Sequence, residues 1–287
     1  MPLARLLPVL AIVGSVLSLC IGSSYAKTLF PLLGPQGTTA IRLLVGTCIL
    51  LTVWRPWRWP LSRRGAALIA CYGVVLGVMN LTFYLAIARI PLAVAIAIEF
   101  TGPLTLSLVS SKRALDIVWI AFAALGLALL LPFQQHAAHL DPLGVVFALA
   151  AAVCWALYII TGQRAGNLHG GQATSLGLLV GALVILPIGW HQASRALLRP
   201  SLLASGLVVG LLSSALPYSL EMFALKRLPK QTFGILLSME PAVGALVAMG
   251  MIDEVLTPRQ WLAIMAIMLA SIGSTICANP SSALATS

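Results

Sequence analysis

Two glutamates stand inside long apolar stretches of this chain, each close to a proline. Glu99 lies eight residues after Pro91 and four before Pro103, and Glu240 directly precedes Pro241. At the helical rise, Glu99 lies about 12 Å and Glu240 about 16 Å from the start of its own stretch. An ionised carboxylate at that depth costs on the order of several kcal/mol, so each is protonated, paired or facing a water-filled cavity. Either acid is a site for a proton or a cation, or else a structural ion pair or a protonated hydrogen-bonding group.

The prolines beside these acids remove backbone donors. Pro103 cannot donate to the carbonyl of Glu99, and Pro241 cannot donate to the carbonyl of Leu237. A freed carbonyl needs water or a ligand, and interrupted helices at matching positions of two halves are typical of transport sites. The alternative is a packing kink at Pro103 and Pro241, covered by neighbouring Ser or Thr side chains.

Three further pairs of polar or aromatic residues have helical spacing within apolar stretches: Asn80 and Tyr84, Trp155 and Tyr158, and Tyr218 and Glu221. Each pair shares one helix face. Packing or an interfacial belt is the alternative for the aromatic residues. For Glu221 we favour an ion pair with Lys226 or Arg227. Arg42, the one basic residue within a predicted span, either snorkels to the interface or reaches towards Glu99.

The composition places these residues in a membrane. The 287 residues are 60% hydrophobic and 8% charged, with a mean hydropathy of +1.02. Such a chain cannot coat a soluble globule with polar side chains. Apolar stretches of roughly 17–25 residues predict ten transmembrane helices. They lie at 7–26, 37–54, 66–87, 91–110, 116–132, 142–162, 172–190, 201–224, 229–251 and 259–278.

The distribution of charge predicts the topology. The net charge is +10, and with the N-terminus in the cytoplasm eleven Lys and Arg residues are cytoplasmic against five outside. This follows the positive-inside rule and argues against nucleic-acid binding. We predict an inner-membrane protein with both termini in the cytoplasm. Arg5, an apolar run and Ser24-Tyr25-Ala26 resemble a cleavable signal, but residues 18–27 align with 155–164, so we expect this segment to be retained.

The two halves resemble each other. Leu43-Leu44-Val45-Gly46 after Thr39 returns as Leu178-Leu179-Val180-Gly181 after Thr174, and Ala88-Arg89-Ile90-Pro91 as Lys226-Arg227-Leu228-Pro229. Five helices per repeat is an odd number, so the second copy enters the membrane from the opposite side. The predicted fold is therefore an all-α integral membrane protein of ten transmembrane helices in two inverted five-helix repeats. The repeats are residues 1–132 and 142–287, joined by an external linker at 133–141.

No metal or cofactor is predicted. His136, His139 and Asp141 lie close together in the linker, but a metal site needs three or four convergent ligands. We interpret the linker as a solvated segment. The five cysteines lie singly in five different spans, which is typical of small core residues.

Several stretches resemble the bacterial threonine and homoserine exporters of the EamA branch of the drug/metabolite transporter superfamily. They are Gly37–Leu43, Ala97–Leu104, Gly162–Gly166, Leu216–Met222 and Ser238–Ala242. The Glu-Phe-Thr-Gly-Pro and Pro-Tyr-Ser-Leu-Glu-Met strings are the more specific ones. The resemblance covers essentially the whole chain. It implies a central cavity formed chiefly by spans three, four, eight and nine, and export of small neutral amino acids in exchange for protons. The second half departs from symmetry because Glu240 precedes its proline directly, which argues against two equivalent glutamates.

A zwitterionic amino acid brings an ammonium and a carboxylate to such a site. Glu99 is our choice for the ammonium or the coupling proton. Arg42, Asn80 or Tyr218 would meet the carboxylate, and Trp155 and Tyr158 would limit the size of the side chain. The expected partners are the amino acid, protons and membrane lipid, with the protein a monomer or a homodimer.

Two other functions are alternatives to amino-acid export. An integral-membrane enzyme finds no support, because the chain has no HExxH, no GxSxG and no acids clustered with His near a membrane face. A transporter of another cargo is the closer rival. Phosphorylated cargo would need several Lys or Arg residues inside the protein, and only Arg42 qualifies. Export of another small metabolite or of a cationic drug stays open.

Overall fold

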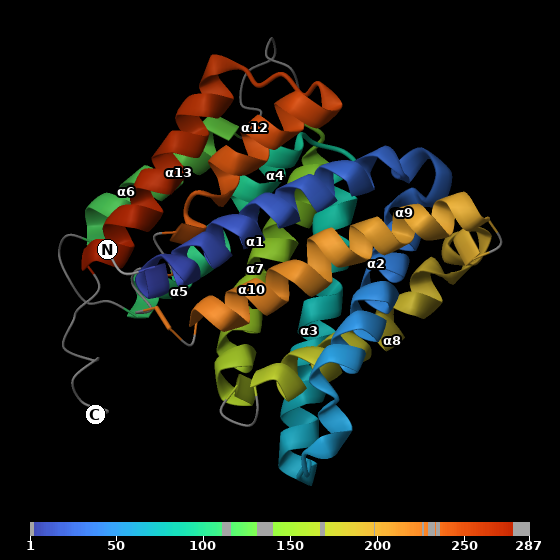
Figure 1. Cartoon of the computed structure of the whole chain (residues 1–287). Coiled ribbons are helices and arrows are strands. Elements are labelled where there is room, and N and C mark those ends of the chain that lie inside the picture. Colours follow the sequence, from blue (N-terminus) through green and yellow to red (C-terminus); the bar gives the residue numbers. More distant parts are fainter. Residues whose placement is uncertain are drawn as a thin grey trace, which may run out of the picture.

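The computed structural model describes residues 3–110, 116–130, 140–166, 170–197, 199–225, 227–228, 233 and 236–277 (Figure 1). This part of the chain is helical and contains no strand. The helices of the first half are α1 (Leu3–Thr28), α2 (Phe30–Trp54), η1 (Pro56–Arg58), α3 (Arg63–Ile87), α4 (Leu92–Glu99), α5 (Thr101–Ser110) and α6 (Asp116–Leu130). Those of the second half are α7 (Pro142–Gly166), α8 (Gly170–Leu197), α9 (Pro200–Gly210), η2 (Leu211–Ala215), α10 (Leu216–Leu225), α12 (Glu240–Ile252) and α13 (Pro258–Cys277).

Helix is present in the described part of every range predicted as a span. Within the described residues, six helical segments are long and apolar enough to cross a membrane by themselves: Leu6–Thr28, Phe30–Arg58, Arg63–Ile87, Pro142–Gly162, Gly171–Ser194 and Pro200–Glu221. Helix satisfies every backbone group within one segment, which lipid requires because it offers no hydrogen bonds. The prediction of an all-α, multi-pass membrane protein is confirmed.

Large apolar side chains cover the outer faces of these helices. Leu10, Ile117, Leu183 and Leu246 are each 60% exposed or more. On a soluble protein an apolar surface of this extent would promote aggregation. In a bilayer these side chains contact lipid tails, which explains the apolar exterior.

The second helix begins earlier than the predicted boundary of 37. α2 starts at Phe30 and continues through a bend at Gly34, whose φ of 64° and ψ of 165° are not helical, next to Pro35. Glycine adopts this backbone conformation without a steric penalty. Arg42 therefore lies twelve residues, or about 18 Å, from the start of its helix, whereas the predicted start at 37 placed it five residues in.

The helices of one half pack against those of the other. α2 packs against α8, α4 against α12, and α6 against α13. α3 packs against α7 and α8, whereas α1 packs against α10 and α12, and α1 and α10 run side by side in Figure 1. Small residues permit close approach: a Cβ at Gly77 would lie 3.0 Å from the Cα of Gly181. The polar residues of the two halves are thereby brought into one interior.

Candidate functional site

Glu99 is the last residue of a short helix. α4 ends there, Phe100 intervenes, and α5 begins at Thr101. The hydroxyl of Thr101 donates to the carbonyl of Ile98 at 2.6 Å, which helps to satisfy the backbone at this interruption. The side chain of Glu99 is 8% exposed and has no hydrogen-bond partner among the described residues. A buried carboxyl group thus stands at a helix end, three residues before Gly102 and four before Pro103.

Glu240 has the opposite place in its helix. It is the first residue of α12, and Pro241 lies in the first turn, where a missing N–H breaks no helical hydrogen bond. The side chain of Glu240 is 5% exposed. α4 packs against α12, so the two acids belong to neighbouring helices. One acid ends a helix and the other begins one.

Arg42 is held inside the protein by the π-helical segment η2. Its Nε donates to the Ser214 hydroxyl at 3.0 Å, and its Nη2 donates to the carbonyl of Ser213. Its Cζ lies 5.1 Å from the ring centroid of Tyr84. Arg42 is 3% exposed and therefore does not snorkel. It interacts electrostatically with Glu99, but it forms no ion pair with any carboxylate in the described part of the chain.

Asn80 and Tyr84 face the same interior from α3. The Asn80 amide donates to the carbonyl of Leu76 at 2.8 Å, and the side chain is also hydrogen-bonded to Tyr218. Tyr84 is fully buried against Phe30, with ring centroids 5.6 Å apart. The hydroxyl of Tyr84 has no partner among the described residues. The structure thus brings the α3 pair together with Tyr218 and Arg42.

The aromatic pair on α7 contacts two different partners. Trp155 meets Phe100 edge to face at 5.4 Å, directly at the interruption after Glu99. Tyr158 stacks on Tyr72 at 5.0 Å and is hydrogen-bonded to it. Sequence reasoning missed Tyr72. The signal was present, because Tyr72 continues the i, i+4 series of Asn80 and Tyr84 by two further steps.

Glu221 has a partner that the sequence did not indicate. It accepts a hydrogen bond from the Ser15 hydroxyl of α1 at 2.8 Å. Arg227 instead donates to the carbonyl of Phe223 at 3.1 Å and lies 3.9 Å from the ring of that residue. Lys226 lies outside the described residues. Glu221 therefore belongs to the interior beside the tyrosines and not to an ion pair with Arg227.

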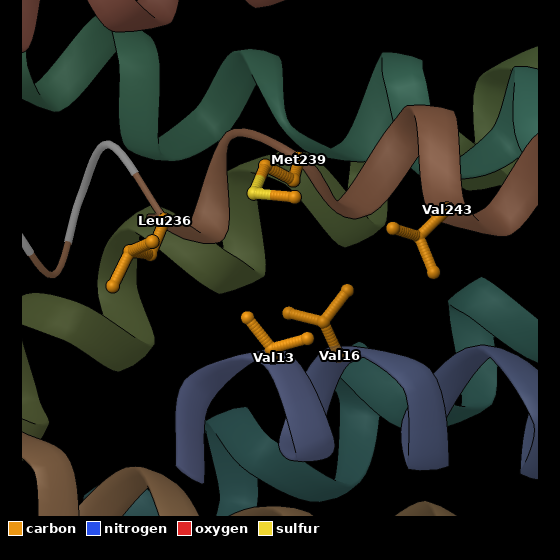
Figure 2. Close-up of a pocket in the computed structure, with 5 residues that line it drawn as sticks. All are labelled: Val13, Val16, Leu236, Met239 and Val243. Carbon is orange, nitrogen blue, oxygen red and sulfur yellow. The ribbon is translucent and has the colours of Figure 1, made fainter. Parts of the chain in front are cut away.

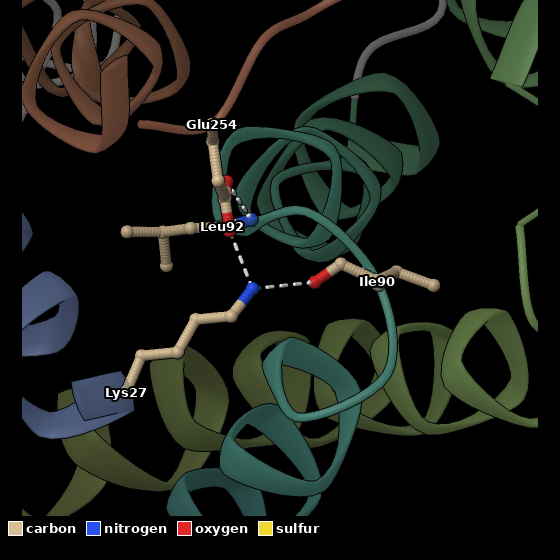
Figure 3. A network of polar contacts seen from close by, with 4 residues as sticks. All are labelled: Lys27, Ile90, Leu92 and Glu254. Atoms are coloured by element: carbon tan, nitrogen blue, oxygen red, sulfur yellow. Dashed lines mark hydrogen bonds and ion pairs between the residues drawn. The ribbon is translucent and has the colours of Figure 1, made fainter. Parts of the chain in front are cut away.

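A second polar network joins three segments at one end of the bundle. Figure 3 shows Lys27 of α1 paired with Glu254, which follows α12. The Lys27 ammonium also donates to the carbonyl of Ile90 at 3.2 Å, and the Leu92 N–H donates to Glu254 at 2.7 Å. Glu254 therefore caps the N-terminus of α4, the helix that ends at Glu99. Sequence reasoning missed this network because its members belong to three segments that are far apart in the sequence.

A small pocket lies between α1 and the segment that enters α12 (Figure 2). Its lining is apolar: Val13, Val16, Leu236, Met239 and Val243. It offers no group for an ammonium or a carboxylate. The polar cluster around Glu99 and Arg42 is accordingly the candidate site for a polar substrate.

The described residues contain no group of three or more His, Cys, Asp or Glu side chains that could hold a metal ion. His136 and His139 lie outside them. Asp141 accepts hydrogen bonds from Arg89 and from the N–H of Leu143, both at 2.9 Å, and so caps α7. The hydrogen bond from Arg89 holds the pKa of Asp141 below its ordinary value.

Comparison with known proteins identifies transporters as the relatives of this chain. The model of the EamA-like transporter family matches residues 142–276. The threonine/homoserine exporter RhtA of Escherichia coli (strain K12) is 49% identical over 270 residues, which cover 94% of this chain and 92% of the exporter. RhtA of Salmonella typhimurium (strain LT2) shows the same identity and coverage. The transporter YwfM of Bacillus subtilis (strain 168) is 28% identical over 83% of this chain and 84% of its own.

A solved crystal structure shares the fold. It has a TM-score of 0.59 and 17% sequence identity, and the match covers 93% of this chain and 97% of that one. The fold is that of a multi-pass membrane protein, and its relatives define the class as a membrane transporter. The chain belongs to the EamA-like transporter family. It is a transporter and not an enzyme, as the sequence predicted.

Proposed function

We propose that this protein exports small neutral amino acids, threonine and homoserine among them, across the bacterial inner membrane by proton-coupled alternating access. The relatives named as threonine/homoserine exporters support small neutral amino acids as the substrate. The observation that carries the proposal is that an acid and a base, Glu99 and Arg42, are both buried and are not joined in an ion pair within the described residues. Their opposite charges match the ammonium and the carboxylate of a zwitterion.

Helix position distinguishes the two glutamates. The C-terminal end of a helix carries a partial negative charge that attracts a cation, and the N-terminal end attracts an anion. Glu99 ends α4, so carboxylate and helix end together favour a substrate ammonium or a proton. Glu240 begins α12, which stabilises its charge without a cation. Glu99 is therefore the residue that we assign to the ammonium or the coupling proton.

The remaining members of the cluster fit the rest of the substrate. Arg42, Asn80 and Tyr218 supply donors for the carboxylate. Trp155 and Tyr158 are large aromatic side chains on the α7 wall and would restrict the cargo to a short side chain. Glu99 and Arg42 are nearly inaccessible, so cargo enters in a conformation that is more open than this one. A proton that leaves Glu99 when the ammonium binds would couple the two fluxes.

The packing of the helices supports two inverted repeats at 1–132 and 142–287. α2–α8, α4–α12 and α6–α13 each pair an element with its counterpart, and the contact of α3 with α7 is matched by that of α1 with α10. The match to the family model begins at residue 142, where the second repeat starts. With ten crossings and both termini in the cytoplasm, a reporter fused after Arg64 reads cytoplasmic and one at His136 reads external. The same location for both reporters would contradict the inverted arrangement.

Export of a cationic drug is the second candidate. The observation that favours it is an excess of acid among the described residues of the interior: Glu99 and Glu240 are buried and Glu221 is partly buried, and the buried base there is Arg42. Uptake of radiolabelled compounds into inverted vesicles with an imposed pH gradient distinguishes the two. Amino-acid export predicts uptake of threonine and homoserine above the rest of an amino-acid panel. A flat response to amino acids with uptake of lipophilic cations would favour the drug exporter.

A further inference from the structure

Arg42 is bound by two consecutive residues of a helix with unusual geometry. In η2 the Leu216 N–H donates to the carbonyl of Leu211, five residues earlier, as in a π-helix. Pro217 stands four residues after Ser213 and has no N–H, so it cannot make the α-helical bond to the Ser213 carbonyl. That carbonyl accepts from Arg42 instead. The Ser214 hydroxyl accepts from Nε of the same guanidinium.

Close packing on two sides fixes this segment. A Cβ at Gly22 of α1 would lie 2.8 Å from the nitrogen of Ser213, and a Cβ at Gly46 of α2 would lie 2.8 Å from the Cβ of Ser214. The Ser18 hydroxyl also donates to the carbonyl of Leu212 at 2.6 Å. η2 is thus held between α1 and α2. The Arg42 guanidinium is therefore oriented by one backbone carbonyl and one hydroxyl of a tightly packed segment.

Two hydrogen-bond donors beside η2, one on Arg42 and one on Tyr84, have no acceptor within the described residues. Nη1 of Arg42 makes no hydrogen bond within the described residues, and the guanidinium has no carboxylate partner there. The Tyr84 hydroxyl, on the ring beside that guanidinium, is fully buried and also lacks a partner in this part of the chain. A buried guanidinium with no carboxylate in contact and a buried hydroxyl without an acceptor are both costly. An anionic acceptor would satisfy both.

We propose that Arg42 and Tyr84 form the binding site for the carboxylate of the transported amino acid, and that Ser213 and Ser214 are positioning residues for Arg42. This inference rests on the proposed function and selects one of its three carboxylate donors. A guanidinium fork matches a carboxylate in geometry, which an ammonium on a flexible stem does not. The cargo must therefore carry a carboxylate, and an amino alcohol of the same shape is a poor substrate.

The test compares threonine with threoninol, which lacks the carboxylate, in proteoliposomes that contain the full-length protein. Arg42→Lys, Tyr84→Phe and Ser214→Ala are each expected to raise the KM for threonine, by about 10- to 100-fold for Arg42→Lys and less for the others. Vmax changes little, and threoninol transport stays as in the wild type. Ser219→Ala is the matched control, because Ser219 donates only to the carbonyl of Ala215, at 2.6 Å, and should alter neither substrate.

Tyr84→Phe keeps the test decisive if Arg42→Lys does not fold. Removal of an unpartnered buried hydroxyl does not weaken the fold, so a purely structural role predicts no change in KM. An unchanged KM for threonine in Tyr84→Phe and Ser214→Ala, or equal losses for threonine and threoninol, overturns the carboxylate site while export stands. A wild-type protein that transports no amino acid overturns the proposed function instead.

Discussion

Glu254 accepts a hydrogen bond from the N–H of Leu92 at 2.7 Å, and Leu92 begins the helix that ends at Glu99. The same carboxylate pairs with Lys27 of α1. Glu254→Gln removes the charge that serves both contacts. We expect a loss of roughly 1–3 kcal/mol of stability, because hydrogen bonds to charged groups contribute about that much. Thermal unfolding in detergent measures it.

Asp253→Asn is the control for that variant. Asp253 is exposed and has left-handed backbone angles, with a φ of 52°, which Asn also adopts readily. Its unfolding temperature should match that of the wild type. Equal shifts in the two variants would mean that general loss of negative charge, and not the cap on α4, explains the effect.

Gly102 lies where α5 approaches the backbone of α7. A Cβ at this position would lie 2.7 Å from the carbonyl carbon of Ala152, and backbone cannot move aside cheaply. Gly102→Ala should therefore cost about 1–3 kcal/mol or more and lower the amount of folded protein. Gly250→Ala, with nothing within 4 Å of the new Cβ, should be neutral or stabilise α12 by up to about 1 kcal/mol. Fluorescence-detected size exclusion after heating compares them.

The helices were predictable because their signal is local. Apolar runs and their charged boundaries located helical segments at every expected place, and Pro103 predicted the interruption after Glu99. The start of α2 was misplaced because Gly34 and Pro35 look like a boundary, whereas the chain bends there and continues as helix. Glycine next to proline marks a change in direction and does not by itself end a span.

The partners of the site residues were not predictable in the same way. Arg42 has its partners at Ser213 and Ser214, far along the chain, and they depend on the register of a π-helix. Glu221 looked like a partner for nearby basic residues, yet it meets Ser15 of the first helix. Such contacts follow from how the two halves pack, which no spacing within one helix encodes.

Asp141 gives a prediction on pH. The hydrogen bond from Arg89 and the cap on α7 lower the pKa of Asp141, so its stabilising effect is complete above the unfolded pKa of about 4. That effect is lost as the pH falls through the lower, folded pKa. Asp141→Asn keeps the cap but removes the charge. It should unfold more easily than the wild type at pH 7 and equally at pH 2, and equal stability at pH 7 would show that the pair with Arg89 contributes nothing.

Pro103→Ala tests whether the interruption after Glu99 serves transport. The new N–H can donate to the carbonyl of Glu99, which favours continuous helix through Phe100. Transport should fall on the order of tenfold, because displaced reacting groups cost that much or more, with little loss of protein in the membrane. Pro187→Ala, in the exposed part of α8, is the control. Equal losses of abundance and transport would assign Pro103 to packing.

The pH change in proteoliposomes on addition of threonine or homoserine tests the central claim most directly. Glu99→Gln keeps the size and polarity of the side chain but cannot carry a titrating proton. We predict that substrate-driven proton movement disappears in Glu99→Gln while the protein stays folded and inserted, and that Glu240→Gln retains most of the signal. Proton movement at the wild-type rate in Glu99→Gln, or its loss in Glu240→Gln alone, would contradict the assignment of Glu99 as the coupling residue.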